Sequence, residues 1–169
     1  MSVVARPART SDVNAIRAVV APLAQARVLI AKEAVAYYEA LQEFTVAEMD
    51  GEVVGCGALH VMWDDLAEIR TLAVRAGFTG RGVGQAVLEA LVERARDIDV
   101  DRLFCLTFEV DFFSRNGFEV IDGTPVEPEV FVELLRSHDD GVAEFLDLAR
   151  VKPNTLGNTR MLRVLKAGR

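Results

Sequence analysis

The sequence predicts an α/β domain of three layers, with helices on both faces of a mixed, mostly antiparallel sheet. Short β-rich runs joined by tight turns predict an antiparallel meander over residues 44–74. A strand–helix–strand segment follows, because apolar residues recur at helical spacing over residues 84–97 and a β-rich run lies at 103–108. A meander followed by such a crossover is typical of this class.

The first elements are predicted from a proline and from polar capping residues. A strand at residues 2–5 is expected to stop at Pro7, which lacks a backbone N–H. Polar residues 10–12 offer side-chain oxygens that cap a helix running through Val20. Pro22 is expected to interrupt that helix.

A second helix is predicted for roughly residues 32–42, with Val35, Tyr38, Leu41 and Gln42 near one face. The remaining elements are strands at residues 44–48, 53–62 and 66–74 with turns at 50–51 and 64–65, the helix at 84–97, a strand at 103–108, a short helix, a helix at 130–136 and a strand at 160–165. Residues 141–151 are compatible with more than one type of element.

Length and charge limit the classes of function. The 169 residues are the size of one domain, so residues 1–169 are expected to form a single unit of function. The net charge of −7 argues against a nucleic-acid partner, which requires a basic surface. An anionic ligand would have to meet a local cluster of Lys and Arg.

Compartment and metal content are predicted from what the sequence lacks. The N-terminus has no apolar signal segment and no apolar run is long enough for a membrane span, so we expect a cytoplasmic protein without a membrane partner. Cys56 and Cys105 lie in hydrophobic runs and are expected to be buried thiols. His60 and His138 are isolated from other ligand-type residues, so no metal is expected.

A glycine-rich junction carries the first sign of function. Gly77, Gly80, Gly82 and Gly84 lie between a predicted strand and the long helix, with Arg81 among them. Glycines let a backbone approach a ligand closely, and a helix N-terminus offers unpaired N–H groups to a phosphate. The spacing fits neither a Walker A loop nor a dinucleotide fingerprint. The alternative is a turn that only connects the strand to the helix.

The junction resembles the signature of the GNAT acetyltransferase superfamily, Arg/Gln-x-x-Gly-x-Gly/Ala. Residues 79–84 match it, except that Thr79 replaces the usual Arg or Gln. Residues 112–118 resemble the family's Phe-Tyr-x-x-x-Gly-Phe segment. The resemblance implies a GNAT-like three-layer α/β/α domain and acetyl-CoA as co-substrate.

Within this superfamily, the sequence resembles the acetyltransferase domain of N-acetylglutamate synthases, in particular their short, single-domain bacterial form. The segments that carry it are residues 44–48, 54–59, 67–74 and 103–107. It implies acetyl transfer to the α-amino group of L-glutamate, the first step of arginine biosynthesis.

Acetyl transfer to an amine needs a base, stabilisation of an oxyanion and a leaving thiolate. The resemblance places Glu68 at the position of the catalytic glutamate, and the N–H of Leu72 where it polarises the thioester carbonyl. A glutamate of ordinary pKa ~4.3 is a weak base, so it acts through water or has its pKa raised by burial. The alternative is a structural pair with Arg70 or another cation.

The resemblance also supplies the acetyl-CoA contacts. Leu72, Ala73 and Val74 would pair with the pantetheine arm through their backbone. The residues at the pyrophosphate would be Thr79, Gly80, Arg81, Gly82, Val83, Gly84 and Gln85. Phe113 stands where many relatives carry a general-acid Tyr, so the thiolate leaves unassisted or another group protonates it.

A dianionic acceptor needs cationic residues. The resemblance places Lys32 and Arg160 at basic positions of the synthases, and Arg70 is a third candidate; a solvated surface charge is the alternative for each. The acceptor could instead be glutamine, another amino acid, a polyamine or a protein amine, or the chain could be a non-catalytic sensor of acetyl-CoA or amino acids. The sequence leaves open the oligomeric state, a homodimer included, and inhibition by arginine.

Overall fold

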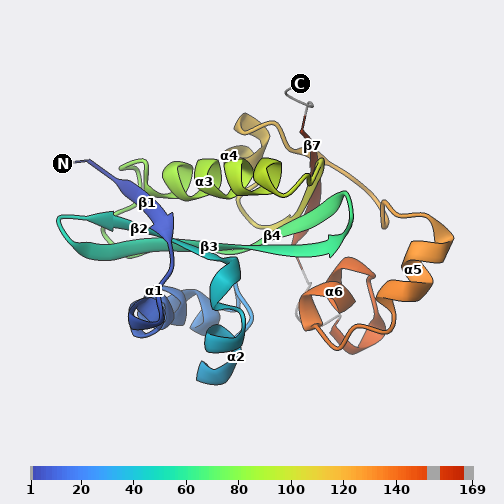
Figure 1. The fold of residues 1–169 in the computed structure, drawn as a ribbon, viewed down its shortest axis with the longest axis horizontal. Helices are drawn as coiled ribbons and strands as arrows, with labels where there is room; N and C mark the ends of the chain where they lie inside the picture. The colour runs from blue at the N-terminus through green and yellow to red at the C-terminus, as the bar shows by residue number, and fades with distance from the viewer. Residues whose placement is uncertain (1, 152–156, 166–169) are drawn as a thin grey trace. The chain divides into compact units, whose positions relative to one another are not determined.

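The computed structural model describes residues 2–151 and 157–165 and contains seven strands and six α-helices in this part of the chain (Figure 1). The strands are β1 (Val4–Pro7), β2 (Phe44–Met49), β3 (Glu52–Trp63), β4 (Leu66–Val74), β5 (Arg102–Thr107), β6 (Glu119–Val120) and β7 (Thr159–Val164). The helices are α1 (Val13–Gln25), α2 (Ala34–Glu39), α3 (Val83–Asp97), α4 (Val110–Arg115), α5 (Pro128–Leu134) and α6 (Asp140–Phe145), with 3-10 turns η1 (Thr10–Asp12), η2 (Leu41–Glu43) and η3 (Ala149–Val151).

The chain divides into two compact units, one of residues 1–60 and 68–99, the other of residues 61–67 and 100–169. The strand order is β1-β2-β3-β4 along the first unit and β5-β7-β6 in the second. The predicted α/β class, with a mixed and mostly antiparallel sheet, is confirmed.

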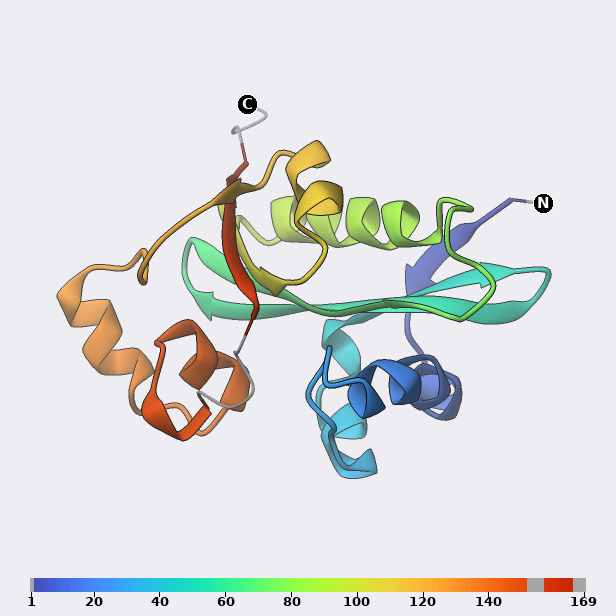
Figure 2. The ribbon, with the colours of Figure 1, turned by 180° about the vertical axis from the view of Figure 1, so that it is seen from behind.

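The first unit is a layered structure. β1 pairs antiparallel with β2, and β2 with β3. α1 and α2 cover one face of these strands and α3 covers the other, as the two opposite views show (Figures 1 and 2). The core beneath α1 and α2 contains Ile16, Tyr37, Val46, Cys56 and Ala73, each with at most 4% of its surface exposed. Both faces of the strands are therefore closed by apolar packing.

The second unit has its own core. β5 pairs antiparallel with β7, which also pairs with β6. Phe104 of β5 and Phe145 of α6 are fully buried and meet edge to face, with 4.8 Å between ring centroids. Aromatic pairs of this geometry stabilise a core beyond their buried area.

Most of the meander agrees with the prediction. Asp50 and Gly51 both have positive φ, as a two-residue hairpin turn requires. The turn at residues 64–65, the long helix and the strands on either side of it are also confirmed. Cys56 and Cys105 are buried and form no disulfide, as expected. In the described part of the chain, no helix is long and apolar enough to cross a membrane.

Three expectations near the N-terminus are wrong. α1 continues through Pro22 to Gln25. A proline in the last turn removes only one backbone hydrogen bond, which lies close to the end of the helix. No side chain caps α1; the carboxylate of Asp12 instead accepts hydrogen bonds from Arg6 and from the N–H of Arg9. β1 runs to Pro7, which lies on an edge strand, where a missing N–H is tolerated.

The predicted face of α2 is also wrong. Tyr37 is buried, whereas Val35 and Tyr38 are 59% and 49% exposed. Tyr37 meets Phe44 of β2, with 5.8 Å between ring centroids. α2 has only six residues, so tertiary packing, and not a helical repeat, decides which side chain turns inward. The sequence pattern also misses β6, which has two residues.

Candidate functional site

The glycine-rich junction joins β4 to α3 in the first unit. After β4, the Arg75 N–H still donates to the carbonyl of Val54 at 2.8 Å. A turn follows in which the Phe78 N–H donates to the Arg75 carbonyl at 3.0 Å. The helix then begins at Val83, directly after Gly82.

The loop leaves space where a ligand could reach the backbone. Gly77, Gly80 and Gly82 have φ of +87°, +77° and +81°, which glycine adopts without strain. A β-carbon added to any of them would meet nothing within 4 Å. The first N–H groups of α3 have no partner within the helix, and its dipole favours negative charge there. The loop therefore fits a phosphate group.

Close packing fixes the start of α3 on the sheet. Val83 is 1% exposed. A β-carbon at Gly55 of β3 would overlap Val83 Cγ1 and lie 3.3 Å from the carbonyl of Ala73. Gly55 thus lets the helix N-terminus lie directly against the end of β4, next to the backbone of Ala73 and Val74.

Positive charge is gathered around one aromatic ring of the loop. The guanidinium groups of Arg75 and Arg81 lie 5.7 and 5.2 Å from the centroid of Phe78. Such cation–π contacts hold cations in place at an exposed site. Arg75 is also paired with Glu52 at 3.0 Å, and Gln85 donates to Glu89 at 2.9 Å. Arg75 and Arg81 thus place two guanidinium groups beside the glycine loop, of which that of Arg75 is paired with Glu52.

Glu68 and Arg70 lie on β4 in a buried ion pair. Arg70 Nη2 is 3.1 Å from Glu68 Oε2, and the two side chains are 10% and 7% exposed. The Glu68–Arg70 ion pair, which was the structural alternative to a catalytic Glu68, is therefore present. It does not exclude catalysis, because a carboxylate has two oxygens and several lone pairs.

The strand is distorted between Arg70 and Leu72. Thr71 has φ of +58°, which is unusual for a β-branched residue. The carbonyl oxygen of Thr71 accepts a hydrogen bond from the buried thiol of Cys56, whose Sγ lies 3.5 Å away. Burial raises the pKa of Cys56 to about 12, so this thiol stays protonated and able to donate. The distortion lies next to the Leu72 N–H, the group assigned to the thioester carbonyl.

Two predicted residues belong to the second unit. Phe113 is 5% exposed and packs edge to face on Phe112 and Phe118, at 5.2 and 5.1 Å. Arg160 donates to three backbone carbonyls, those of Gly123, Glu144 and Phe145, at 2.9, 3.1 and 2.5 Å. Its guanidinium also lies 4.9 Å from the ring centroid of Phe104.

The structure thus brings together the residues of β4 and the glycine loop within the first unit. Lys32 is exposed in the segment before α2, also in the first unit. Gly55, Thr71 and Phe78 were not predicted from the sequence as residues of the site. A glycine within a strand signals a close backbone approach, so Gly55 was detectable, whereas nothing in the sequence marks the backbone of Thr71. Among residues 2–151 and 157–165, no group of three metal-binding side chains occurs.

Comparison with known proteins gives a consistent result. The profile of the acetyltransferase (GNAT) family matches residues 20–118. An amino-acid acetyltransferase from Mycobacterium tuberculosis is 58% identical over 165 residues, which are 96% of this chain and 94% of that protein.

Solved structures show the same fold. A crystal structure from Mycobacterium tuberculosis, in complex with CoA and NLQ, has a TM-score of 0.94 and 57% identity, and the match covers 96% of this chain and 99% of that one. The N-acetylglutamate synthase of Neisseria gonorrhoeae has a TM-score of 0.78 at 24% identity, over 98% of this chain and 36% of the synthase. The chain belongs to the acetyltransferase (GNAT) family and is an acyltransferase.

Proposed function

We propose that this protein transfers the acetyl group of acetyl-CoA to the α-amino group of L-glutamate. The binding of acetyl-CoA is supported by the open space around Gly80 and Gly82. This space lies at the N-terminus of α3, next to Arg81 in the sequence. In this proposal the loop from Thr79 to Gln85 holds the pyrophosphate. The backbone of Ala73 and Val74 binds the pantetheine arm as an added strand would.

In the chemical step, the amine attacks the thioester carbon while the Leu72 N–H donates to the developing oxyanion. A fixed backbone donor at this point lowers the barrier because the charge forms where the dipole already points. Glu68 acts as base during the attack, directly or through water, and Arg70 holds its carboxylate in place. The C–S bond then breaks and the thiolate leaves.

An amino acid as acceptor is supported by the Mycobacterium tuberculosis relative, which is an amino-acid acetyltransferase. Glutamate is proposed because Lys32 places an exposed cation in the first unit of a chain whose net charge is −7, with Arg70, which is paired with Glu68, as a second candidate contact. Arg160 belongs to the second unit, where it donates to three backbone carbonyls, and its role at a carboxylate stays a prediction from the resemblance. The reaction would begin arginine biosynthesis in the cytoplasm, carried out by residues 1–169 as a single domain.

Substitution of Lys32 tests the choice of glutamate. Because Lys32 is exposed, the Ala variant is expected to fold normally. A charge-assisted contact to a carboxylate contributes ~1.5–3 kcal/mol, so the KM for glutamate should rise about ten- to a hundredfold. Alanine, which lacks the side-chain carboxylate, is the matched acceptor. A smaller effect on alanine indicates that Lys32 binds the side chain; equal KM values for wild type and variant on both acceptors refute the assignment.

A further inference from the structure

The peptide unit between Thr71 and Leu72 of β4 is held at its carbonyl end by a side chain of β3. The thiol of Cys56 donates to the carbonyl oxygen of Thr71, with Sγ 3.5 Å from that oxygen. The carbonyl and the N–H of a trans peptide unit lie in one plane and point in opposite directions. The structure has no cis peptide bond in the ranges that it describes. The N–H of Leu72 therefore points away from Cys56, and the bond from the thiol fixes its direction.

The backbone of Thr71 depends on such contacts because its conformation is strained. Its φ of +58° lies in the left-handed region, where a branched β-carbon crowds the backbone. A strained conformation persists only where the surrounding structure holds it, and such residues gather at functional sites. The strain here lies in the residue directly before Leu72, whose N–H is the proposed donor to the oxyanion.

Packing of the Leu72 side chain holds the other end of the same peptide unit. Leu72 Cδ1 lies 3.1 Å from the position that a β-carbon at Gly57 would occupy. Side chains of α3, Val87 and Leu91, fill the rest of this space. The peptide unit is thus held at one end by packing against α3 and at the other by the thiol in the core beneath α1 and α2.

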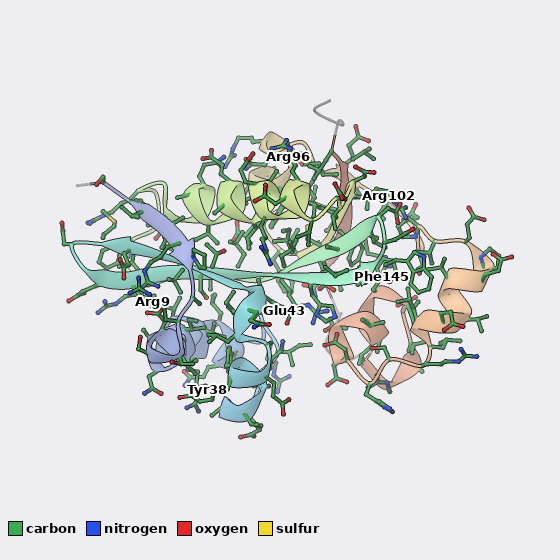
Figure 3. The ribbon with its side chains drawn as sticks, viewed as in Figure 1. Arg9, Tyr38, Glu43, Arg96, Arg102 and Phe145 are labelled. Carbon is green, nitrogen blue, oxygen red and sulfur yellow. The ribbon has the colours of Figure 1, made fainter. Side chains whose placement is uncertain are left out.

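Water cannot take the place of the thiol. Cys56 is fully buried, in the core that also contains Tyr37 and Val46. α2 turns Tyr37 into this core, whereas Tyr38 lies on the outer side of the helix, away from the strands (Figure 3). Burial raises the pKa of the thiol, so the thiol keeps the hydrogen that it donates. Without the thiol, the carbonyl of Thr71 would lose a donor that solvent does not replace.

The chemistry of acetyl transfer makes the direction of the Leu72 N–H important. As the amine attacks the thioester carbon, an electron pair of the C=O bond moves onto the oxygen. The negative charge forms where a donor has to be aimed already, and it disappears when the C–S bond breaks and the thiolate leaves. A hydrogen bond accepted by a peptide carbonyl also polarises the N–H of the same unit, which makes that N–H a stronger donor.

We propose that Cys56 is a positioning residue for acetyl transfer, which aims and polarises the Leu72 N–H through its bond to the Thr71 carbonyl. This inference rests on the proposed function, in which that N–H stabilises the oxyanion. Cys56 has no exposed surface, so it acts through the backbone and not by contact with the acetyl group. Its effect concerns the thioester and is therefore expected with any amine acceptor.

Cys56→Ala and Cys56→Ser test this role, because the two side chains have almost the same volume and differ in one donor. The rates are measured at saturating acetyl-CoA, with the acceptor that the wild type uses best. Cys56→Ala should lower kcat about 5- to 50-fold, less than the ~10²–10³ that loss of an entire oxyanion donor costs. Cys56→Ser should recover most of this loss, because a hydroxyl can donate to the same carbonyl.

Val46→Ala is the matched control for the cavity that the substitution leaves. Val46 is fully buried in the same core and lies directly opposite Cys56 in the register of β2 and β3. Its truncation opens space at the same place but removes no donor. The kcat of Val46→Ala should therefore stay within about twofold of wild type.

Infrared spectroscopy measures the two hydrogen bonds directly. In bound acetyl-CoA labelled with ¹³C at the acetyl carbonyl, donation from the Leu72 N–H lowers the C=O stretching frequency. This frequency should rise in Cys56→Ala and stay unchanged in Val46→Ala. The S–H stretch of the wild type, in the difference spectrum against Cys56→Ser, should be that of a hydrogen-bonded thiol. The affinity for acetyl-CoA should stay within about threefold, because the N–H acts mainly on the transition state.

The inference is overturned if Cys56→Ala, with a cooperative melting transition, keeps kcat within about twofold of wild type or leaves the frequency of the bound carbonyl unchanged. It is also overturned if Val46→Ala loses as much kcat, or if Cys56→Ser is no more active than Cys56→Ala, because the cavity then explains the loss. Should Cys56→Ala fail to fold, the wild-type S–H stretch decides, and the frequency of a free thiol overturns the inference.

Failure of the proposed function gives a different result. Wild-type turnover on the panel of amino acids reports on that function, whereas the ratio of variant to wild type reports on Cys56. An active wild type with an unaffected Cys56→Ala refutes only the role of Cys56. A wild type that acetylates no amino acid refutes the proposed acceptor, and the frequency of the bound carbonyl, which needs acetyl-CoA alone, then decides the role of Cys56.

Discussion

Replacing Gly82 with Ala is expected to weaken acetyl-CoA binding much more than it destabilises the fold. Gly82 has φ of +81°, and an added β-carbon would meet no atom within 4 Å. The folded protein therefore bears only the left-handed strain of an L residue, ~1–2 kcal/mol. The methyl group, however, would occupy the space in front of α3, where a phosphate has to approach the backbone N–H groups.

The magnitude follows from the bonds that would be lost. Two charge-assisted bonds at ~1.5–3 kcal/mol each correspond to a rise in Kd of about 10²- to 10⁴-fold. Gly77→Ala is the matched control, because Gly77 has φ of +87° and equally open surroundings but lies outside the proposed contacts. Urea unfolding and titration calorimetry with acetyl-CoA measure the two effects. Wild-type affinity in Gly82→Ala, or an equal loss of affinity in Gly77→Ala, would contradict the assignment of Gly82 to the pyrophosphate site.

Three further predictions concern named side chains. Glu68→Gln should lower kcat about ten- to a thousandfold while acetyl-CoA affinity, measured by calorimetry, stays within about threefold; near-normal turnover would make Glu68 structural. Arg160→Ala should lower the free energy of urea unfolding by about 2–5 kcal/mol, because three carbonyls of the second unit lose their donor; an unchanged unfolding curve would free Arg160 for a substrate role alone. The hydrogen bonds from Arg6 lower the pKa of Asp12, so its stabilisation, about 1–3 kcal/mol, is present above the ordinary carboxyl pKa of ~4 and lost as the pH falls below it. Asp12→Asn should thus lower stability at pH 7 and show a smaller further loss between pH 4 and 2; parallel pH curves for wild type and variant would contradict this.

The elements that were predicted correctly are those with a strong local signal. The Asp50-Gly51 turn has residues that accept positive φ, and α3 has a long apolar stripe. The face of α2 was not predictable, because one contact between Tyr37 and Phe44 outweighs the short helical pattern. The continuation of α1 through Pro22 likewise depends on where the helix ends, which local sequence fixes poorly.

The residues of the candidate site also fall into those that the sequence could predict and those that it could not. Glycines and Arg81 were visible in the sequence because their function depends on residue type and spacing. The partners of Glu68 and Arg160 were not, because they depend on the fold. Arg160, expected at the substrate, donates to three backbone carbonyls, a use that no pattern around residue 160 indicates.

The most direct test of the account is thiol release from acetyl-CoA by the wild-type protein with a panel of acceptors. The panel contains glutamate, glutamine, alanine, lysine and a polyamine, each at several concentrations. The highest kcat/KM is expected with glutamate or its amide, and mass spectrometry should find the acetyl group on the α-nitrogen. Absence of thiol release with every amino acid, or a preference for the polyamine, would contradict it.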